Sequence, residues 1–218
     1  MTNTKLMSYR KIPDAETLEK AQGYRLILEL DFNDIIPFVL SNIRKASLSS
    51  FFYLIINSAT LIFVIIYALW SVNNGQLNGG RVILQVLAGV LAGSLLVIPP
   101  HELLHGFAYR ILGARKIKFG VDLQQFIFYV TADRFPISKG ELAFLALTPF
   151  VFINLVLILI TALWAPQITL LSASLLLSHN IMCIGDFAMI SYACSHKGEL
   201  FTYDDTEKKL SYFFERLD

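Results

Sequence analysis

The chain has 218 residues, of which 55% are hydrophobic and only 16% are charged, and its formal net charge is +1. So apolar a composition excludes an ordinary soluble domain and indicates an integral membrane protein. The nearly neutral charge excludes the basic balance of a nucleic-acid-binding protein, so we expect the lipid bilayer and other proteins or peptides as partners, and no nucleic acid.

The first 46 residues are mixed in polarity and are predicted to form a cytoplasmic N-terminal segment. Within it, YRLILEL (24–30) alternates weakly between apolar and polar residues, which favours a strand. DFNDIIPFVLSNIRK (31–45) is compatible with a helix lying on the inner membrane surface. We therefore predict a strand and a surface helix before the first long apolar run.

Four apolar segments are long enough to cross the hydrocarbon core of a bilayer, which takes roughly 20 helical residues. They are Leu48 to Trp70, Val82 to about Leu112, Leu142 to Trp164, and Ile168 to about Ala193. Pro99-Pro100 interrupts the second, and because proline lacks an N–H and disfavours helix in the residue before it, we expect a kink or a fresh helix start. The carbonyls left without donors are tolerated in a membrane only beside protein or a wet cavity, so the break marks a candidate cavity.

The distribution of basic residues predicts the orientation of these segments. Seventeen of the 18 Lys and Arg residues lie before the first segment, between the second and third, or after the fourth. By the positive-inside rule, both termini and the middle loop (113–140) face the cytoplasm.

The cytoplasmic connections also carry β-like patterns. FGVDLQQFIFYVTA (119–132) can form a hairpin, and ELFTYDDTEKKLSYFFE (199–215) places a polar turn between two strand-like runs. We therefore predict an α-helical integral membrane protein with about four transmembrane helices and small cytoplasmic β elements. Its core is residues 47–195, and residues 196–218 form a cytoplasmic tail.

The sequence HELLH (101–105) lies just after the proline pair. Residues four apart share one face of a helix, so His101 and His105 can direct ring nitrogens at one metal ion with Glu102 beside it. Zinc peptidases use this spacing, because two imidazoles and a third ligand leave one zinc position open and the glutamate takes a proton from the attacking water. The motif predicts a Zn²⁺ site with Glu102 as general base. The alternative is a charged helix end at the membrane surface, with Glu102 paired to Arg110 or to lipid.

The third metal ligand has to come from elsewhere, and SHNIMCIGDFAM (178–189) in the fourth apolar segment offers candidates. At about 1.5 Å rise per residue, Asp186 reaches the depth of His101, whereas His179 lies about 10 Å nearer the outside. Asp186 is therefore the predicted ligand. Its alternative role is a helix-end acid paired with a cytoplasmic lysine.

Other polar residues near the predicted site have different expected roles. His179 is expected to hydrogen-bond to a neighbouring helix or to line the cavity, and contact of His179 or Asn180 with the metal or substrate stays open. Cys183 is expected to be a small packing residue. Three loop acids follow the motif and remain alternatives for the third ligand: Asp122, Asp133 and Glu141.

Together these features resemble the intramembrane metalloproteases of the site-two-protease type. The resemblance rests on HELLH in an apolar helix, the β-like stretch after it, PISKGELAFLALTPFVFIN (136–154), and Asn180 followed by Gly185-Asp186. The compact layout is more closely similar to a bacterial family of multi-pass membrane proteins classed as zincin peptidases. The resemblance covers roughly residues 80–205. It implies a bacterial plasma membrane and a zinc ion held by His101, His105 and Asp186, with Glu102 as general base.

Two classes of function are consistent with these patterns. The first is a zinc-dependent metallopeptidase that hydrolyses a membrane-embedded or membrane-proximal peptide bond. The second is a non-enzymatic multi-pass membrane protein, a scaffold or a transporter, with a structural metal or none. Glu102 favours the enzyme, because a structural zinc has no use for a base beside an open water position.

Overall fold

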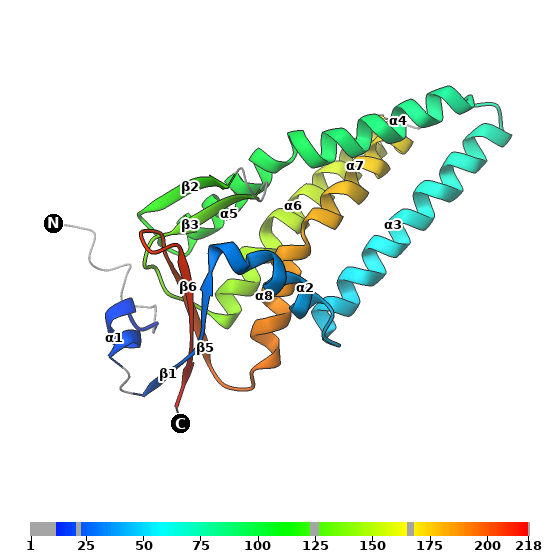
Figure 1. Cartoon of the computed structure of the whole chain (residues 1–218). Coiled ribbons are helices and arrows are strands. Elements are labelled where there is room, and N and C mark those ends of the chain that lie inside the picture. The colour runs from blue at the N-terminus through cyan, green and yellow to red at the C-terminus, as the bar shows by residue number, and fades with distance from the viewer. Residues whose placement is uncertain (1–11, 21–22, 123–126, 165–167, 218) are drawn as a thin grey trace.

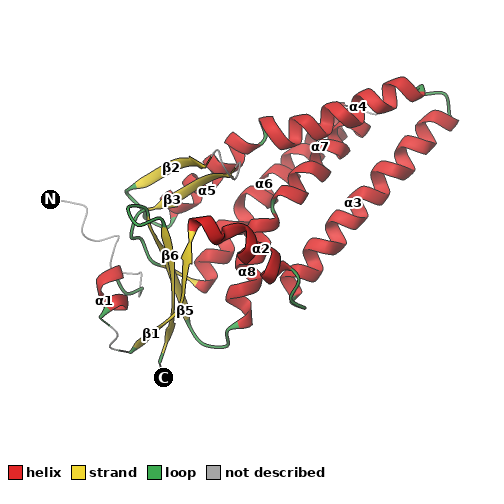
Figure 2. Ribbon diagram, in the orientation of Figure 1, coloured by secondary structure: helices red, strands yellow, loops and turns green. Residues whose placement is uncertain are grey.

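The computed structural model describes residues 12–20, 23–122, 127–164 and 168–217. Long helices form a bundle at one end of the molecule, and short strands gather at the other (Figure 1 and Figure 2). The strands and the short elements beside them are α1 (Ala15–Glu19), β1 (Tyr24–Asp31), η2 (Phe32–Asp34), α2 (Ile35–Ile43), β2 (Ile117–Asp122), β3 (Ile127–Ala132), β4 (Ile137–Ser138), β5 (Leu200–Asp205) and β6 (Leu210–Arg216).

These strands form two small sheets. One has four strands in the order β1-β6-β5-β4, and the other is the two-stranded β2–β3 hairpin. The predicted strand at 24–30 and the two predicted hairpins are therefore confirmed, and the helix predicted within 31–45 is present as α2. The sequence does not predict α1 and β4, which have five and two residues and are too short to show a periodic pattern.

The bundle consists of α3 (Leu48–Asn73), α4 (Gly79–Leu91), η3 (Ala92–Leu96), α5 (Ile98–Ile111), α6 (Lys139–Trp164), α7 (Thr169–Met182) and α8 (Ile184–Ser195). Three stretches are long and apolar enough to cross a membrane: Leu48–Asn73, Gly79–Leu96 and Lys139–Leu163. The α7 and α8 pair passes the same test if it is counted as one span. The molecule is thus mostly helical, with three or four helices of membrane-spanning length and small sheets beside them.

The second apolar segment breaks where the proline pair predicted. After α4 the chain widens into the π-helical turn η3, in which the N–H of Val97 reaches back five residues to the carbonyl of Ala92. Pro99 and Pro100 then occupy the first turn of α5, where the missing N–H groups cost little. HELLH therefore stands on its own short helix.

The fourth apolar segment is not the single helix that was predicted. It breaks at Cys183, and α7 and α8 meet at 42°. No proline marks this break in the sequence, so hydropathy alone could not locate it. The bend sets Asp186 in the first turn of α8.

Small residues bring α4 and α7 into close contact. Gly89 and Gly93 lie one turn apart on the face toward α7, and a Cβ at either position would come within 2.7 Å of a backbone carbonyl oxygen of α7. The hydroxyl of Ser178 in α7 donates to the carbonyl of Val90 at 3.1 Å. This is the small-xxx-small packing that lets membrane helices approach closely. It joins the two apolar segments that carry the predicted metal ligands.

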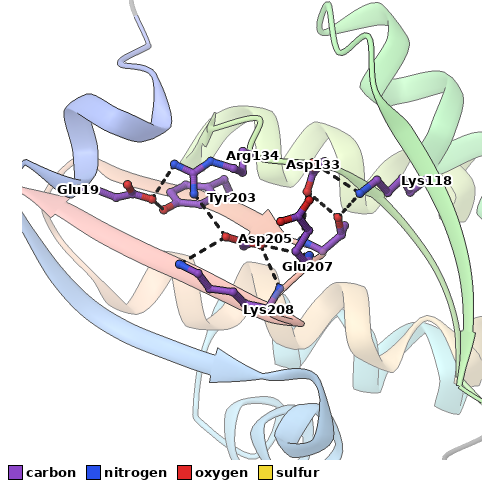
Figure 3. A network of polar contacts seen from close by, with 9 residues as sticks. Glu19, Lys118, Asp133, Arg134, Tyr203, Asp205, Glu207 and Lys208 are labelled. Atoms are coloured by element: carbon purple, nitrogen blue, oxygen red, sulfur yellow. Dashed lines mark hydrogen bonds and ion pairs between the residues drawn. The ribbon is translucent and has the colours of Figure 1, made fainter.

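A polar network anchors the β2–β3 hairpin to the four-stranded sheet (Figure 3). Asp133, directly after β3, pairs with Lys118 of β2 at 3.5 Å and accepts a hydrogen bond from the backbone N–H of Thr206 at 3.1 Å. Arg134 pairs with Glu19 of α1 and with Asp205 at the end of β5. The hydrogen bonds from Thr206 hold the pKa of the Asp133 carboxyl below its usual range. The hairpin is therefore fixed at the end that lies nearest the sheet.

Candidate metal centre

The structure brings three of the predicted site residues together from two helices. His101 and His105 are one turn apart on α5, and Asp186 comes from α8. The two Nε2 atoms lie 3.1 Å apart. The Asp186 carboxylate oxygens lie 3.4 Å from Nε2 of His101 and 3.3 Å from Nε2 of His105.

These distances fit one tetrahedral zinc ion. Zinc binds imidazole nitrogen and carboxylate oxygen at roughly 2.0–2.2 Å, which places two ligand atoms of a tetrahedron roughly 3.3–3.6 Å apart. The separation of 3.1 Å between the two nitrogens, and those of 3.4 and 3.3 Å from each nitrogen to one of the two Asp186 oxygens, come close to this range. Two neutral imidazoles and one carboxylate are also a ligand set that catalytic zinc uses, with a fourth position left open.

A carbonyl in α6 orients His105. The Nδ1 atom of His105 lies 3.1 Å from the carbonyl oxygen of Leu145, so a proton on Nδ1 leaves Nε2 free for the metal. In a regular helix that carbonyl would accept the N–H of residue 149. Residue 149 is Pro149, which lies inside α6 and has no N–H to donate. The proline therefore frees the Leu145 carbonyl for His105.

Replacing Pro149 with alanine is expected to weaken zinc binding by about tenfold, because the new N–H competes with His105 for the Leu145 carbonyl. Alanine is a good helix former, so α6 should persist in the variant. The measurement is competition for zinc against a calibrated chelator. Thr148→Ala is the matched control, since the Thr148 hydroxyl donates within its own helix, to the carbonyl of Phe144. Equal zinc affinity in the two variants would contradict this role of Pro149.

His179 lies closer to the predicted ligands than the depth argument indicated. Its Nε2 is 3.1 Å from Nδ1 of His101, and its side chain is 1% exposed. The predicted separation of about 10 Å concerns backbone depth along the helix axis and leaves out the reach of two imidazoles. The expected hydrogen bond of His179 to a neighbouring helix and its place in the cavity lining are confirmed. His179 can accept the Nδ1 proton of His101 and so orient that ring toward the metal.

The neighbours of His179 pack between helices. Asn180 accepts a hydrogen bond from Asn154 of α6 at 2.7 Å. Cys183 is fully buried and packs with Phe150 and Phe187, as expected of a packing residue.

Two of the loop acids form hydrogen bonds away from the His101, His105 and Asp186 cluster. Asp133 belongs to the network of Figure 3, and Glu141 accepts a hydrogen bond from the backbone N–H of Ser138 at the start of α6. The side chain of Asp122 lies outside the described residues. Among the loop acids that the structure describes, none lines the cavity at the His101, His105 and Asp186 cluster.

Glu102 stands between this cluster and the edge of β3. The backbone N–H of Val130 interacts with its carboxylate. The N–H of Asp133 donates to the carbonyl of Lys116, which directly precedes β2, so these two residues form a hydrogen-bonded pair. In an antiparallel ladder hydrogen-bonded and non-hydrogen-bonded pairs alternate along the strand. Val130 and Phe128 fall in the non-hydrogen-bonded pairs, and their backbone groups therefore point away from β2. The outer edge of β3 therefore presents backbone donors and acceptors beside Glu102. Sequence periodicity predicted the hairpin but could not indicate which edge faces the site.

A cavity of about 470 Å³ contains these groups. Among the lining residues that the structure describes, the ionisable side chains are the cluster itself together with Glu102, His179 and Tyr129, and the rest are apolar. The lining comes from α2, η3, α5, β3, α6, α7 and α8. The cavity predicted beside the proline break is thus present, and it opens onto an edge strand.

One of the three comparisons with known proteins found a match. Residues 94–200 match the model of a family described as "Putative zincin peptidase". The match supports the predicted zincin resemblance, and it contains His101, Glu102, His105 and Asp186. No curated protein and no solved structure matches the chain. The match is consistent with a metallopeptidase, and it leaves α2, β1 and most of the four-stranded sheet outside the matched residues.

Proposed function

We propose that the chain is a zinc-dependent membrane metallopeptidase, with His101, His105 and Asp186 as metal ligands and Glu102 as general base. The observation that carries the proposal is the arrangement of the two histidine Nε2 atoms, 3.1 Å apart, each with one of the two Asp186 carboxylate oxygens 3.3 or 3.4 Å away, beside Glu102. When bound, zinc supplies Lewis-acid chemistry, which polarises a carbonyl group and acidifies water. Glu102 accepts the proton of the attacking water and passes it to the leaving amine.

The β3 edge favours an extended peptide as the substrate. An incoming segment can pair with the backbone groups of Phe128 and with the carbonyl of Val130, as peptides do when they add a strand to a sheet edge. Such pairing uses no side chain of the substrate, and it would place a peptide bond beside Glu102. It therefore supports hydrolysis of a peptide bond in an unfolded or membrane-proximal segment.

The apolar helices support a location in a membrane, which the resemblance suggests is a bacterial plasma membrane. In α3 only 6% of the most apolar window is buried, so its apolar side chains face outward, as in a lipid-exposed helix. The distribution of Lys and Arg favours cytoplasmic termini and a cytoplasmic β2–β3 hairpin. The metal site then opens toward the cytoplasmic side.

Metal analysis of purified protein tests the proposal. Elemental mass spectrometry is expected to find about one zinc per chain in the wild type and a marked loss in Asp186→Ala, because two histidines alone hold zinc weakly. His101→Ala should lose zinc as well. A wild type that holds no zinc, after purification without chelator and attempted reconstitution, would overturn the proposal.

A structural metal is the second candidate, and one observation favours it. His101 Nδ1, His179 Nε2 and Cys183 Sγ offer ligand atoms within 4.8 Å of one another. Cys183→Ser separates the two candidates, because the proposed catalytic site does not use this thiol and should keep its zinc. Loss of zinc in Cys183→Ser, with zinc retained in Asp186→Ala, would favour the structural site.

A further inference from the structure

The lining of the cavity that β3 helps to form includes a helix outside the matched residues. Ile36 and Leu40 of α2 line the cavity. They lie one helical turn apart and are 44% and 43% exposed. Two adjacent, half-exposed aliphatic side chains on one helix face are therefore presented to whatever enters the cavity.

The opposite face of α2 is anchored in the core. Phe38 lies 5.2 Å from the ring of Tyr192 in α8 and 6.3 Å from that of Phe213 in β6, and Asn42 is buried as well. Because this face holds the helix in place, Ile36 and Leu40 are fixed in position without contributing much to the packing. They can be changed without removing the contacts that hold α2.

An aromatic contact joins the turn before α2 to β3. Phe32, just before α2, packs edge-to-face against Tyr129 of β3, with ring centroids 5.4 Å apart. Gly120 of β2 makes room for this tyrosine, since a Cβ there would overlap the Tyr129 ring. The spacing between α2 and β3 is therefore held by packed rings.

We infer that α2 is the specificity wall of the site, where Ile36 and Leu40 receive an apolar side chain of the peptide that pairs with β3. The inference rests on the proposed function and adds the substrate class, which is a peptide with an aliphatic or aromatic side chain near the scissile bond. A charged side chain is disfavoured at this wall, because burying a charge among apolar groups without a partner is costly. The N-terminal segment, rather than the matched residues, then determines what is cleaved.

Binding of two zinc-directed probes tests the inference without requiring turnover. The probes are fluorescein-labelled peptide hydroxamates that are identical except for leucine or lysine at the residue next to the hydroxamate. Wild-type protein loaded with zinc in detergent is expected to bind the leucine probe at least about tenfold tighter by fluorescence polarisation. Ile36→Glu and Leu40→Glu are each expected to reduce this ratio by about tenfold or more, because a carboxylate on the wall attracts the lysine.

Leu26→Glu is the matched control. Leu26 is an apolar residue of β1 that is 47% exposed, and it does not line the cavity. This variant should keep the wild-type ratio, and all variants should keep about one zinc per chain. Equal binding of the two probes by the zinc-loaded wild type, no binding of either, or an unchanged ratio in both α2 variants would overturn the inference. A wild type without zinc would instead overturn the proposed function, and the inference with it.

Discussion

Replacing Glu102 with glutamine is expected to lower peptidase turnover by about 10²- to 10⁴-fold while leaving about one zinc per chain. Glutamine keeps the size of the side chain, and it can still interact with the Val130 N–H through its oxygen, but it cannot take a proton from water. General bases contribute roughly this factor to enzymatic rates. The measurement is kcat on a fluorogenic apolar peptide in detergent, with zinc determined on the same preparation.

His105→Ala is the control for this experiment, because it removes a proposed ligand and should lose zinc and turnover together. Loss of turnover with zinc retained in Glu102→Gln, against loss of both in His105→Ala, is what identifies Glu102 as a base. If Glu102→Gln lost as much zinc as His105→Ala, Glu102 would have a structural role at the site. If Glu102→Gln kept both zinc and full turnover, the base would have to be another residue.

The local part of the site was predictable from the sequence, because it depends on helix geometry alone. HELLH places His101 and His105 on one face at any depth in any fold. The closeness of Asp186 to the two histidines was predictable from helix rise, because the second and fourth apolar segments are both predicted to run inward from the outer side. The contact of His179 was not predictable in the same way, because it depends on side-chain reach and on the break at Cys183.

The residues that support the metal ligands were harder to predict, although Pro149 can be recognised in the sequence. Pro149 lies four residues after Leu145, and a proline inside an apolar helix always frees the carbonyl four residues earlier. Which side chain uses that carbonyl depends on the packing of α5 against α6. In the same way, α2 was predicted as a helix, but its place on the cavity wall depends on β1 pairing with β6 near the other end of the chain.

Gly89 and Gly93 also carried a sequence signal, since their four-residue spacing is typical of close helix packing in membranes. Gly89→Ala is expected to destabilise the folded protein by about 1–3 kcal/mol. The added Cβ would lie within 2.9 Å of three atoms of α7, two of them backbone atoms of Leu171 and Leu175. Backbone cannot move aside as a flexible side chain can, so α4 and α7 must separate.

The same substitution at Gly140 is the control, because a Cβ there meets nothing within 4 Å and alanine favours helix over glycine. Gly140→Ala should leave the unfolding midpoint in detergent unchanged or raise it, whereas Gly89→Ala should lower it. Equal midpoints in the two variants would show that α4 and α7 tolerate separation. Because α4 continues through η3 into α5, and α7 continues into α8, a shift at Gly89 also moves His101 relative to Asp186. Zinc affinity should therefore fall together with stability in Gly89→Ala, although no metal ligand has been changed.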